Sequence, residues 1–253
     1  MMLGMLLTTY LSFVSVASAA PAATCDRDFL KAQTAAYIAA QTAGKVDGLK
    51  ASSSVTYTQN FKAASLATGI LATPLKIDGN RSTYDTTQCA TFTELIITTG
   101  TPHVIGTQMR FTDGVLSKIE TIVTSSGDWL FNPANTLKYA QQESWTEIPE
   151  AKRDTRAAIQ AAGDAYLDIF NDKTVKVPWG TPCARLEGGT YMQPSCSVGV
   201  PSGVKNINRR YVVDEVLGSC DIFFSFAGAD PDSHEFRLEN GKLRYVHTMT
   251  VMK

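Results

Sequence analysis

The stretch that decides the fold is Thr107–Ile122, TQMRFTDGVLSKIETI, and it has a later counterpart in His234–Met249, HEFRLENGKLRYVHTM. In each stretch, two strand-like runs flank an Asp-Gly or Asn-Gly pair, which is the strongest short signal for a β-hairpin. At an offset of 127 residues, Gly114 of the first stretch meets Gly241 of the second. We therefore predict two related hairpins in two related halves.

An amphipathic helix precedes each hairpin, over residues 26–43 and 151–170. Apolar side chains recur there at helical spacing, and Tyr37 of the first helix meets Tyr166 of the second at an offset of 129. Near-constant offsets of this kind indicate a diverged internal duplication. The alternative is that amphipathic helices and hairpins resemble one another without common origin.

Further strand-like runs complete each half. They are expected at 89–99, 103–112 and 115–124, then at 209–217, 220–227, 234–239 and 242–251, with a short extended run at 55–57. Loops are expected around Pro74 and Gly79 and from Pro178 to Val204. A helix followed by an antiparallel meander predicts the α+β class. We expect two lobes, each a helix packed on a curved antiparallel sheet, at 20–130 and 151–253, joined by a linker at 131–150.

The N-terminal segment predicts export. Residues 2–16 carry no charge, and Ala17-Ser18-Ala19 has the small-x-small pattern of a signal-peptidase site, so we interpret 1–19 as a signal peptide. A buried N-terminal helix is the alternative. No later stretch is long and apolar enough to predict stable membrane insertion, which favours secretion or the lumen of the secretory pathway. Asn80-Arg81-Ser82 is an N-glycosylation sequon, expected on a surface loop.

The chain has five cysteines, and in an oxidising compartment they predict two disulfides with one thiol left over. Cys183 and Cys196 bracket a loop rich in glycine and proline, so we expect them to pair. Cys25 and Cys89 form the second predicted bridge, from the start of the first helix to the first strand of the meander. Cys220 would then be a buried free thiol.

The composition excludes several classes of protein. Hydrophobic residues make up 44% of the chain and the net charge is −1, which argues against a nucleic-acid protein or a polybasic membrane binder. Hydrolase, phosphate-loop and dinucleotide motifs are missing from the sequence, as is C-x-x-C. We expect acid–base chemistry without cofactor or metal on a small apolar or anionic molecule, or binding alone. The sequence leaves the oligomeric state open.

His247 is the favoured general base. Leu243, Tyr245, His247 and Met249 alternate along the last predicted strand, and we expect their shared face to line the interior of the second lobe. Histidine alone titrates near neutral pH without tuning. Its counterpart in the first half is Glu120. The competing interpretation is a core histidine that satisfies a structural hydrogen bond.

Three more side chains are candidates for proton transfer. Asp214 stands at a strand end, where an apolar interior would raise its pKa, or it caps a turn. Tyr211 either donates a hydrogen bond to an enolate oxygen or is a core aromatic. His234 follows Asp230-Pro231-Asp232-Ser233, which we interpret as a turn that aims His234 into the site or as a plain capped turn.

Substrate binding is assigned to cationic and aromatic side chains. Arg185, Arg209 and Arg237 are candidates for a bidentate clamp on an anionic substrate, of which Arg185 and Arg237 are favoured. Arg237 recurs as Arg110 in the first half, so a structural role is the alternative. Trp179 either stacks on a flat ligand or closes its loop.

Three phrases give a narrower resemblance: Trp179–Arg185, Arg210–Asp214 and Pro231–Arg237. With the leader and the two lobes, they resemble fungal secreted proteins with tandem cones of the SnoaL, ketosteroid isomerase and nuclear transport factor 2 (NTF2-like) type. Some of these relatives are maleidride dimerising cyclases, which join two maleic-anhydride monomers.

The resemblance implies a carbanion, formed by decarboxylation or proton loss, that then makes a carbon–carbon bond. It implies His247 or Asp214 as base, Tyr211 as oxyanion donor, and Arg185 or Arg237 as anchor. The competing hypothesis is a secreted, non-catalytic protein that binds a small apolar ligand. A base, a hydroxyl donor and a cation around one cavity favour the enzyme, whereas a dry apolar cavity favours the binding protein.

Overall fold

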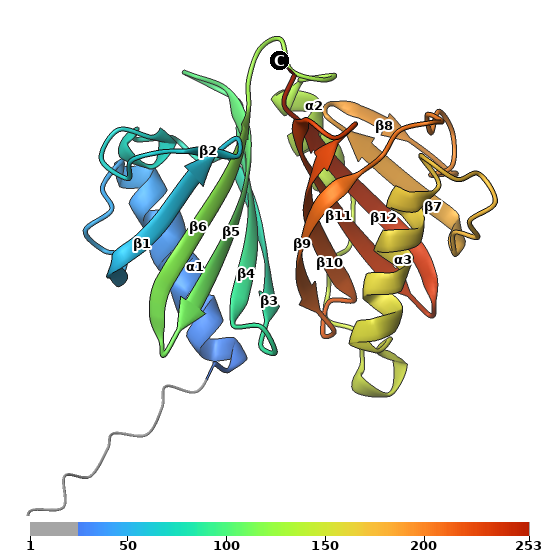
Figure 1. The fold of residues 1–253 in the computed structure, drawn as a ribbon, viewed down its shortest axis with the longest axis horizontal. Helices are drawn as coiled ribbons and strands as arrows, with labels where there is room; N and C mark the ends of the chain where they lie inside the picture. The colour runs from blue at the N-terminus through green and yellow to red at the C-terminus, as the bar shows by residue number, and fades with distance from the viewer. Residues whose placement is uncertain (1–24, 253) are drawn as a thin grey trace, which may run out of the picture.

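The computed structural model describes residues 25–252 and contains two units of the same topology (Figure 1). The predicted signal peptide, 1–19, lies outside the described residues. The first unit consists of α1 (Arg27–Ala43), β1 (Ala51–Gln59), β2 (Lys62–Ala63), the short 3-10 helix η1 (Ile70–Ala72), β3 (Gly79–Asp85), β4 (Ala90–Ile97), β5 (His103–Thr112) and β6 (Val115–Thr124). A connecting segment holds α2 (Pro133–Ala140) and the 3-10 helix η2 (Glu150–Lys152).

The second unit repeats the first. It consists of α3 (Arg156–Asp168), β7 (Trp179–Glu187), β8 (Thr190–Met192), β9 (Ile207–Asp214), β10 (Ser219–Phe226), β11 (Asp230–Glu239) and β12 (Lys242–Thr250). The strand orders are β2-β1-β6-β5-β4-β3 and β8-β7-β12-β11-β10-β9, so corresponding strands occupy corresponding places. The α+β class and the two-unit architecture are confirmed.

Local signals explain the elements that were predicted. Asp26 caps α1 by accepting a hydrogen bond from the backbone N–H of Phe29 (2.8 Å), and Gly44 ends the helix in the left-handed conformation (φ 62°). The β5–β6 hairpin turns at Asp113-Gly114, where both residues have positive φ, and the β11–β12 hairpin does the same at Asn240-Gly241. Two consecutive positive φ angles are what a type I′ turn requires.

Three predicted loops or linkers contain regular structure. The expected loop 178–204 contains β7 and β8, and the expected loop around Gly79 contains β3, so the sequon lies on an edge strand with Asn80 exposed rather than in a loop. The linker contains α2. Each sheet is also mixed rather than purely antiparallel, because β1 pairs parallel to β6 and β7 pairs parallel to β12.

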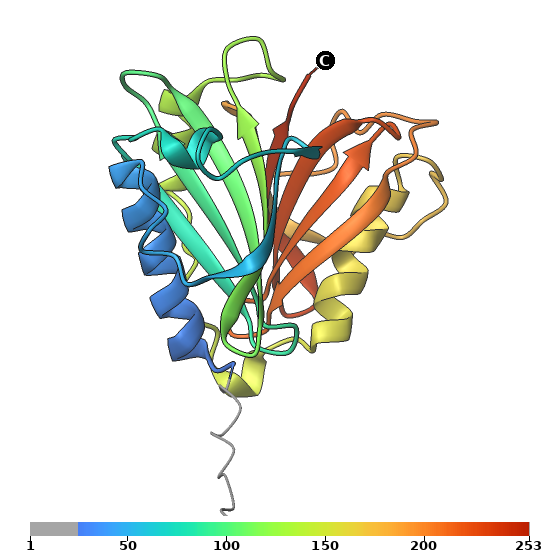
Figure 2. The same ribbon diagram turned by 60° about the vertical axis from the view of Figure 1, so that its left-hand side comes forward.

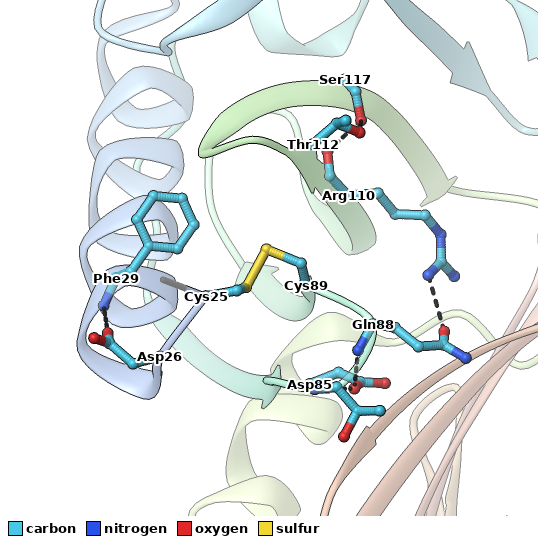
Figure 3. Close-up of a disulfide and its surroundings, with 10 residues drawn as sticks. Cys25, Asp26, Phe29, Asp85, Gln88, Cys89, Arg110, Thr112 and Ser117 are labelled. Atoms are coloured by element: carbon cyan, nitrogen blue, oxygen red, sulfur yellow. Dashed lines mark hydrogen bonds between the residues drawn. A yellow bond between two sulfur atoms is a disulfide. The ribbon is translucent and has the colours of Figure 1, made fainter. Parts of the chain in front are cut away.

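Both predicted disulfides are present. Cys25–Cys89 joins the segment before α1 to the turn between β3 and β4 (Figure 3), and Cys183–Cys196 ties β7 to the loop after β8. Cys220 is free and buried, as predicted. The two bridges indicate an oxidising, extracellular or lumenal setting. Within residues 25–252, no helix is long and apolar enough to cross a bilayer.

The two sheets pack against each other, with α1 and α3 on the outer sides (Figures 1 and 2). Each sheet therefore has one face toward its own helix and one toward the other unit. A shared apolar cluster fills the space between the sheets; it includes Phe92, Ile96 and Ile122 from the first unit and Val212, Phe223 and Met249 from the second. Because both faces are covered, β4 is buried along its whole length.

Reciprocal ion pairs join the two units. Arg27 at the start of α1 contacts Asp214 at the end of β9 (2.7 Å), and Arg156 at the start of α3 contacts Asp85 at the end of β3 (2.7 Å). The two arginines are 129 positions apart in the sequence, and so are the two aspartates. This is the pattern of an isologous interface, in which residue i contacts j and j contacts i. We call these contacts the reciprocal clasp.

Candidate functional site

The second unit contains a cavity of about 330 Å³ between α3 and its sheet. Its volume is at the lower end of the range for small-molecule sites, about 300–1,000 Å³. We call it the cone cavity. Its polar lining comes from α3, β7, β11 and β12 and comprises Tyr166, Arg185, Glu187, Asp230, Asp232, His234 and Thr250.

Asp232 and His234 form a buried pair on β11. They are two positions apart, so strand alternation places both side chains on the cavity face. Asp232 contacts His234 Nδ1 through one oxygen (2.7 Å) and accepts from the Thr250 hydroxyl through the other (2.6 Å). Burial raises the pKa of Asp232, and the contacts with His234 and Thr250 oppose that rise. With the proton on Nδ1 held by Asp232, the lone pair of Nε2 is left to act as a base.

Tyr166 supplies a hydroxyl beside this pair. Its ring centroid lies 5.5 Å from that of His234, and its oxygen accepts a hydrogen bond from Arg185 Nη1 (3.2 Å). Burial raises the pKa of Tyr166 to about 12, although the Arg185 guanidinium opposes the rise. The phenol therefore keeps its proton at physiological pH, and it can donate that proton to an oxygen that develops negative charge.

Arg185 is engaged mainly with the protein. Besides Tyr166, its guanidinium donates to the carbonyls of Cys196 (3.2 Å) and Val198 (2.6 Å) and pairs with Glu187 (3.2 Å). Of its nitrogens, Nε is buried and has no partner among the described residues. The predicted bidentate clamp needs two available donors, whereas this arrangement leaves one.

Aromatic side chains form the remaining walls. The His234 ring lies 5.2 Å from Phe224, 5.8 Å from Phe236 and 6.4 Å from Phe170, measured between ring centroids. Phe170 and Phe226 line the cavity itself. An ionisable pair held among aromatic rings suits proton transfer from carbon, because water is excluded from the reacting atoms.

The first unit lacks this chemistry at the equivalent positions. The strand registers align Asp232, His234 and Thr250 with Ile105, Thr107 and Val123. The helix tyrosine is kept as Tyr37, and its hydroxyl bonds to that of Thr107 (2.7 Å) instead of facing an imidazole. The acid–base pair is thus a property of the second unit and not of the shared fold.

His247 does not face the cone cavity, so the predicted orientation is wrong. The register between β11 and β12 shifts next to Leu243, so Leu243 packs into the core beneath α3 while Met249 packs between the sheets. His247 lies on the inter-sheet side, with Nδ1 3.0 Å from Glu94 and Nε2 2.7 Å from Glu143. Strict alternation failed here because a bulge reverses the faces of the residues on one side of it.

The surroundings of His247 keep it charged. Burial lowers its pKa, but the two carboxylates outweigh burial and Arg81 and raise the pKa to about 9. Burial likewise raises the pKa of Glu94, but Arg81 and His247 overcome this and lower it to about 2. A histidine that holds its proton this firmly is a structural cation and a poor general base near neutral pH.

The ion cluster around His247 predicts a pH window for stability. Protonated His247 contributes on the order of 3 kcal/mol to the stability of the fold, and this contribution is fully present below pH 6.5, the ordinary pKa of histidine. It is lost as the pH rises from 6.5 through 9. The contribution of Glu94 is present above 4.5 and is lost as the pH falls toward 2. Urea unfolding should therefore show greatest stability between pH 4.5 and 6.5. His247→Gln should flatten the alkaline decline, and an unchanged decline would contradict this assignment.

Five other predicted site residues also lie away from the cavity. Asp214 belongs to the reciprocal clasp, the Tyr211 hydroxyl donates to Asp164 (2.8 Å), and Arg237 pairs with Glu239 on its own strand. Trp179 packs edge-on against Tyr166 behind the cavity wall. Arg209 pairs with Asp164 (2.7 Å) and Asp168 (2.5 Å). Of the eight candidates, the structure brings together His234 and Arg185 at the cavity.

Sequence reasoning missed several members of the site. Asp232 was assigned to a turn, although the Asp-x-His spacing also fits two neighbours on one face of a strand. Tyr166 stood out as a mark of the repeat and not as a hydroxyl donor. Trp129 reaches the cavity from the segment after β6, and no local signal links it to the second unit.

Comparison with known families adds one finding. Residues 152–250 match the model described as "Domain of unknown function (DUF8021)". The match runs from η2 to the end of β12 and so contains the whole polar lining of the cone cavity. No curated protein matches the chain. The pair of similar units is consistent with tandem NTF2-like domains.

Proposed function

We propose that the protein is a cofactor-independent acid–base enzyme of the ketosteroid isomerase and cyclase type, with its active site in the cone cavity. The observation that carries the proposal is the convergence of a base, a hydroxyl donor and a cation on one cavity, through His234, Tyr166 and Arg185. A purely apolar cavity would instead have favoured the binding protein.

The chemistry follows from the positions of these groups. His234 Nε2 removes a proton from a carbon next to a carbonyl group, and the electron pair of that C–H bond moves onto the carbonyl oxygen. Tyr166 donates a hydrogen bond to this oxygen, while Asp232 stabilises the imidazolium. The imidazolium then returns its proton to another carbon, which gives an isomer, or the carbanion first attacks an electrophilic carbon, which gives a new carbon–carbon bond.

The resemblance to maleidride dimerising cyclases suggests an alkylmaleic anhydride as substrate. The proton would leave the side-chain carbon attached to the ring, and the ring carbonyls would take up the charge. A cavity of about 330 Å³ suits one such molecule. The second monomer would approach from the mouth of the cavity.

Proton exchange tests this proposal without requiring the complete reaction. Purified protein and a dialkylmaleic anhydride are mixed in D2O at mildly acidic pH, and deuterium at the carbons next to the ring is followed by NMR. We expect exchange about 100-fold or more above buffer. Dimeric products, followed by mass spectrometry, would extend the result to carbon–carbon bond formation. Binding of the anhydride without exchange would refute the enzyme and favour the binding protein.

A further inference from the structure

The cone cavity has a polar inner end and an apolar mouth. The inner end is formed by Tyr166, Arg185, Asp232 and His234, of which none is more than 5% exposed. The partly exposed Asp230 and Glu187 also line the cavity, and its mouth is formed by exposed apolar side chains. Three of them line the cavity, and we call them the apolar collar: Trp129, Pro201 and Met252.

The collar is exposed but fixed in place. Trp129 is 47% exposed and Met252 is 43% exposed. The Trp129 indole nevertheless donates to Glu187 (2.9 Å), and the Met252 backbone N–H donates to Asp128 (2.8 Å). Large apolar side chains held on a surface around a cavity mark a place where apolar ligand surface is buried.

Charge at the inner end determines the head group of the ligand. Arg185 is the only arginine or lysine among the described residues that line the cavity, and Glu187 (3.2 Å) already pairs with it, while Asp230 and Asp232 add further carboxyl groups. A carboxylate head would therefore meet no uncompensated positive charge. The available groups are the Tyr166 hydroxyl and Arg185 Nε as donors and His234 Nε2 as acceptor, which suit a neutral carbonyl group next to an acidic C–H bond.

We infer that the ligand is a neutral amphiphile, with a compact carbonyl head at His234 and Tyr166 and an apolar tail that leaves the cavity across the collar. This inference rests on the proposed function in placing the site in the cone cavity. It adds the substrate class: a ketone, lactone or anhydride with a tail, and not a free acid.

Affinity across a homologous series tests the inference. Methyl alkyl ketones from hexan-2-one to dodecan-2-one are titrated into the whole protein by calorimetry. Each methylene that enters the collar should tighten binding by about fourfold, until the tail extends past it and the increments stop. Alkanoates of equal length should bind at least about tenfold more weakly. Tighter binding of the alkanoates, a flat series, or no binding of any ketone would overturn the inference.

Matched variants place the effect at the collar. Trp129→Ser and Met252→Ser should reduce the increments for the longer ketones and leave hexan-2-one unchanged. Val115→Ser replaces a side chain of similar exposure (39%) on the first unit and should change nothing. Increments that survive both collar substitutions would overturn the assignment.

Deuterium exchange at the carbons next to the ketone, measured on the same samples, separates the two proposals. Length-dependent binding without exchange would remove the enzyme and keep the ligand class. Exchange without length dependence would keep the enzyme and remove the ligand class.

Discussion

Replacing His234 by glutamine is expected to slow carbon proton exchange by about 100- to 10,000-fold, the usual contribution of a general base. Glutamine keeps the approximate length and a polar end of the side chain, but it cannot take up a proton. The fold should survive, because glutamine can keep the contact with Asp232 and the aromatic rings around His234 also pack against one another. The exchange rate, followed by NMR at saturating ligand, gives the result.

His247→Gln is the matched control. It makes the same chemical change on the adjacent strand, at a histidine between Glu94 and Glu143 that lies outside the cone cavity. We expect an unchanged exchange rate, with a lower melting temperature at mildly acidic pH. If His247→Gln abolishes exchange in a folded protein and His234→Gln does not, the site lies between the sheets and the cone cavity is not catalytic.

Replacing Asp85 by alanine is expected to lower the free energy of unfolding by about 3–5 kcal/mol. Asp85 is fully buried and accepts five hydrogen bonds: two from Arg156 and one each from the backbone N–H groups of Thr87, Gln88 and Val213. Its removal leaves the Arg156 guanidinium without its carboxylate and the amide of Val213, in the other unit, without its acceptor.

Thermal and urea unfolding measure this cost. At about 2–4 °C per kcal/mol for a chain of this size, the melting temperature should fall by roughly 10 °C. Asp214→Ala, the symmetry-related change, should cost a comparable amount. Asp47→Ala, on an exposed loop, should stay within about 0.5 kcal/mol of the parent. If Asp85→Ala costs no more than Asp47→Ala, the reciprocal clasp does not hold the units together.

The sequence predicted those elements whose signals are local. Both hairpins follow from Asp-Gly and Asn-Gly pairs and both long helices from their apolar periodicity. The Cys183–Cys196 bridge follows from two cysteines that bracket one loop, and Cys25–Cys89 from the order of the helix and the meander. β3 and β7 were not predicted, because Gly79 in β3 and Pro182 in β7 are residue types that favour loops. Both strands form through pairing with a neighbour, β3 with β4 and β7 with β12, and local sequence does not reveal that pairing.

The site was predictable only in part, for physical reasons. The alternation that pointed His247 inward was interrupted by a bulge next to Leu243, which sequence periodicity does not reveal. His234 was found because histidine is chemically distinctive. The contribution of Trp129 depends on how the segment after β6 packs on the second unit, where its backbone N–H donates to Thr250 (3.3 Å). No pattern within either half contains that information.

The reciprocal clasp also bears on the history of the chain. Contacts of this form are those of a homodimer with two-fold symmetry, here made between two halves of one polypeptide. In a homodimer every substitution appears at two places at once, so both cavities must change together. After a gene duplication and fusion the halves mutate independently, and one can become a permanent scaffold while the other specialises. Fusion also creates a joining segment that has no symmetric copy. That segment delivers Trp129 to the cone cavity of the second unit, so fusion gave one of the two cones an additional wall.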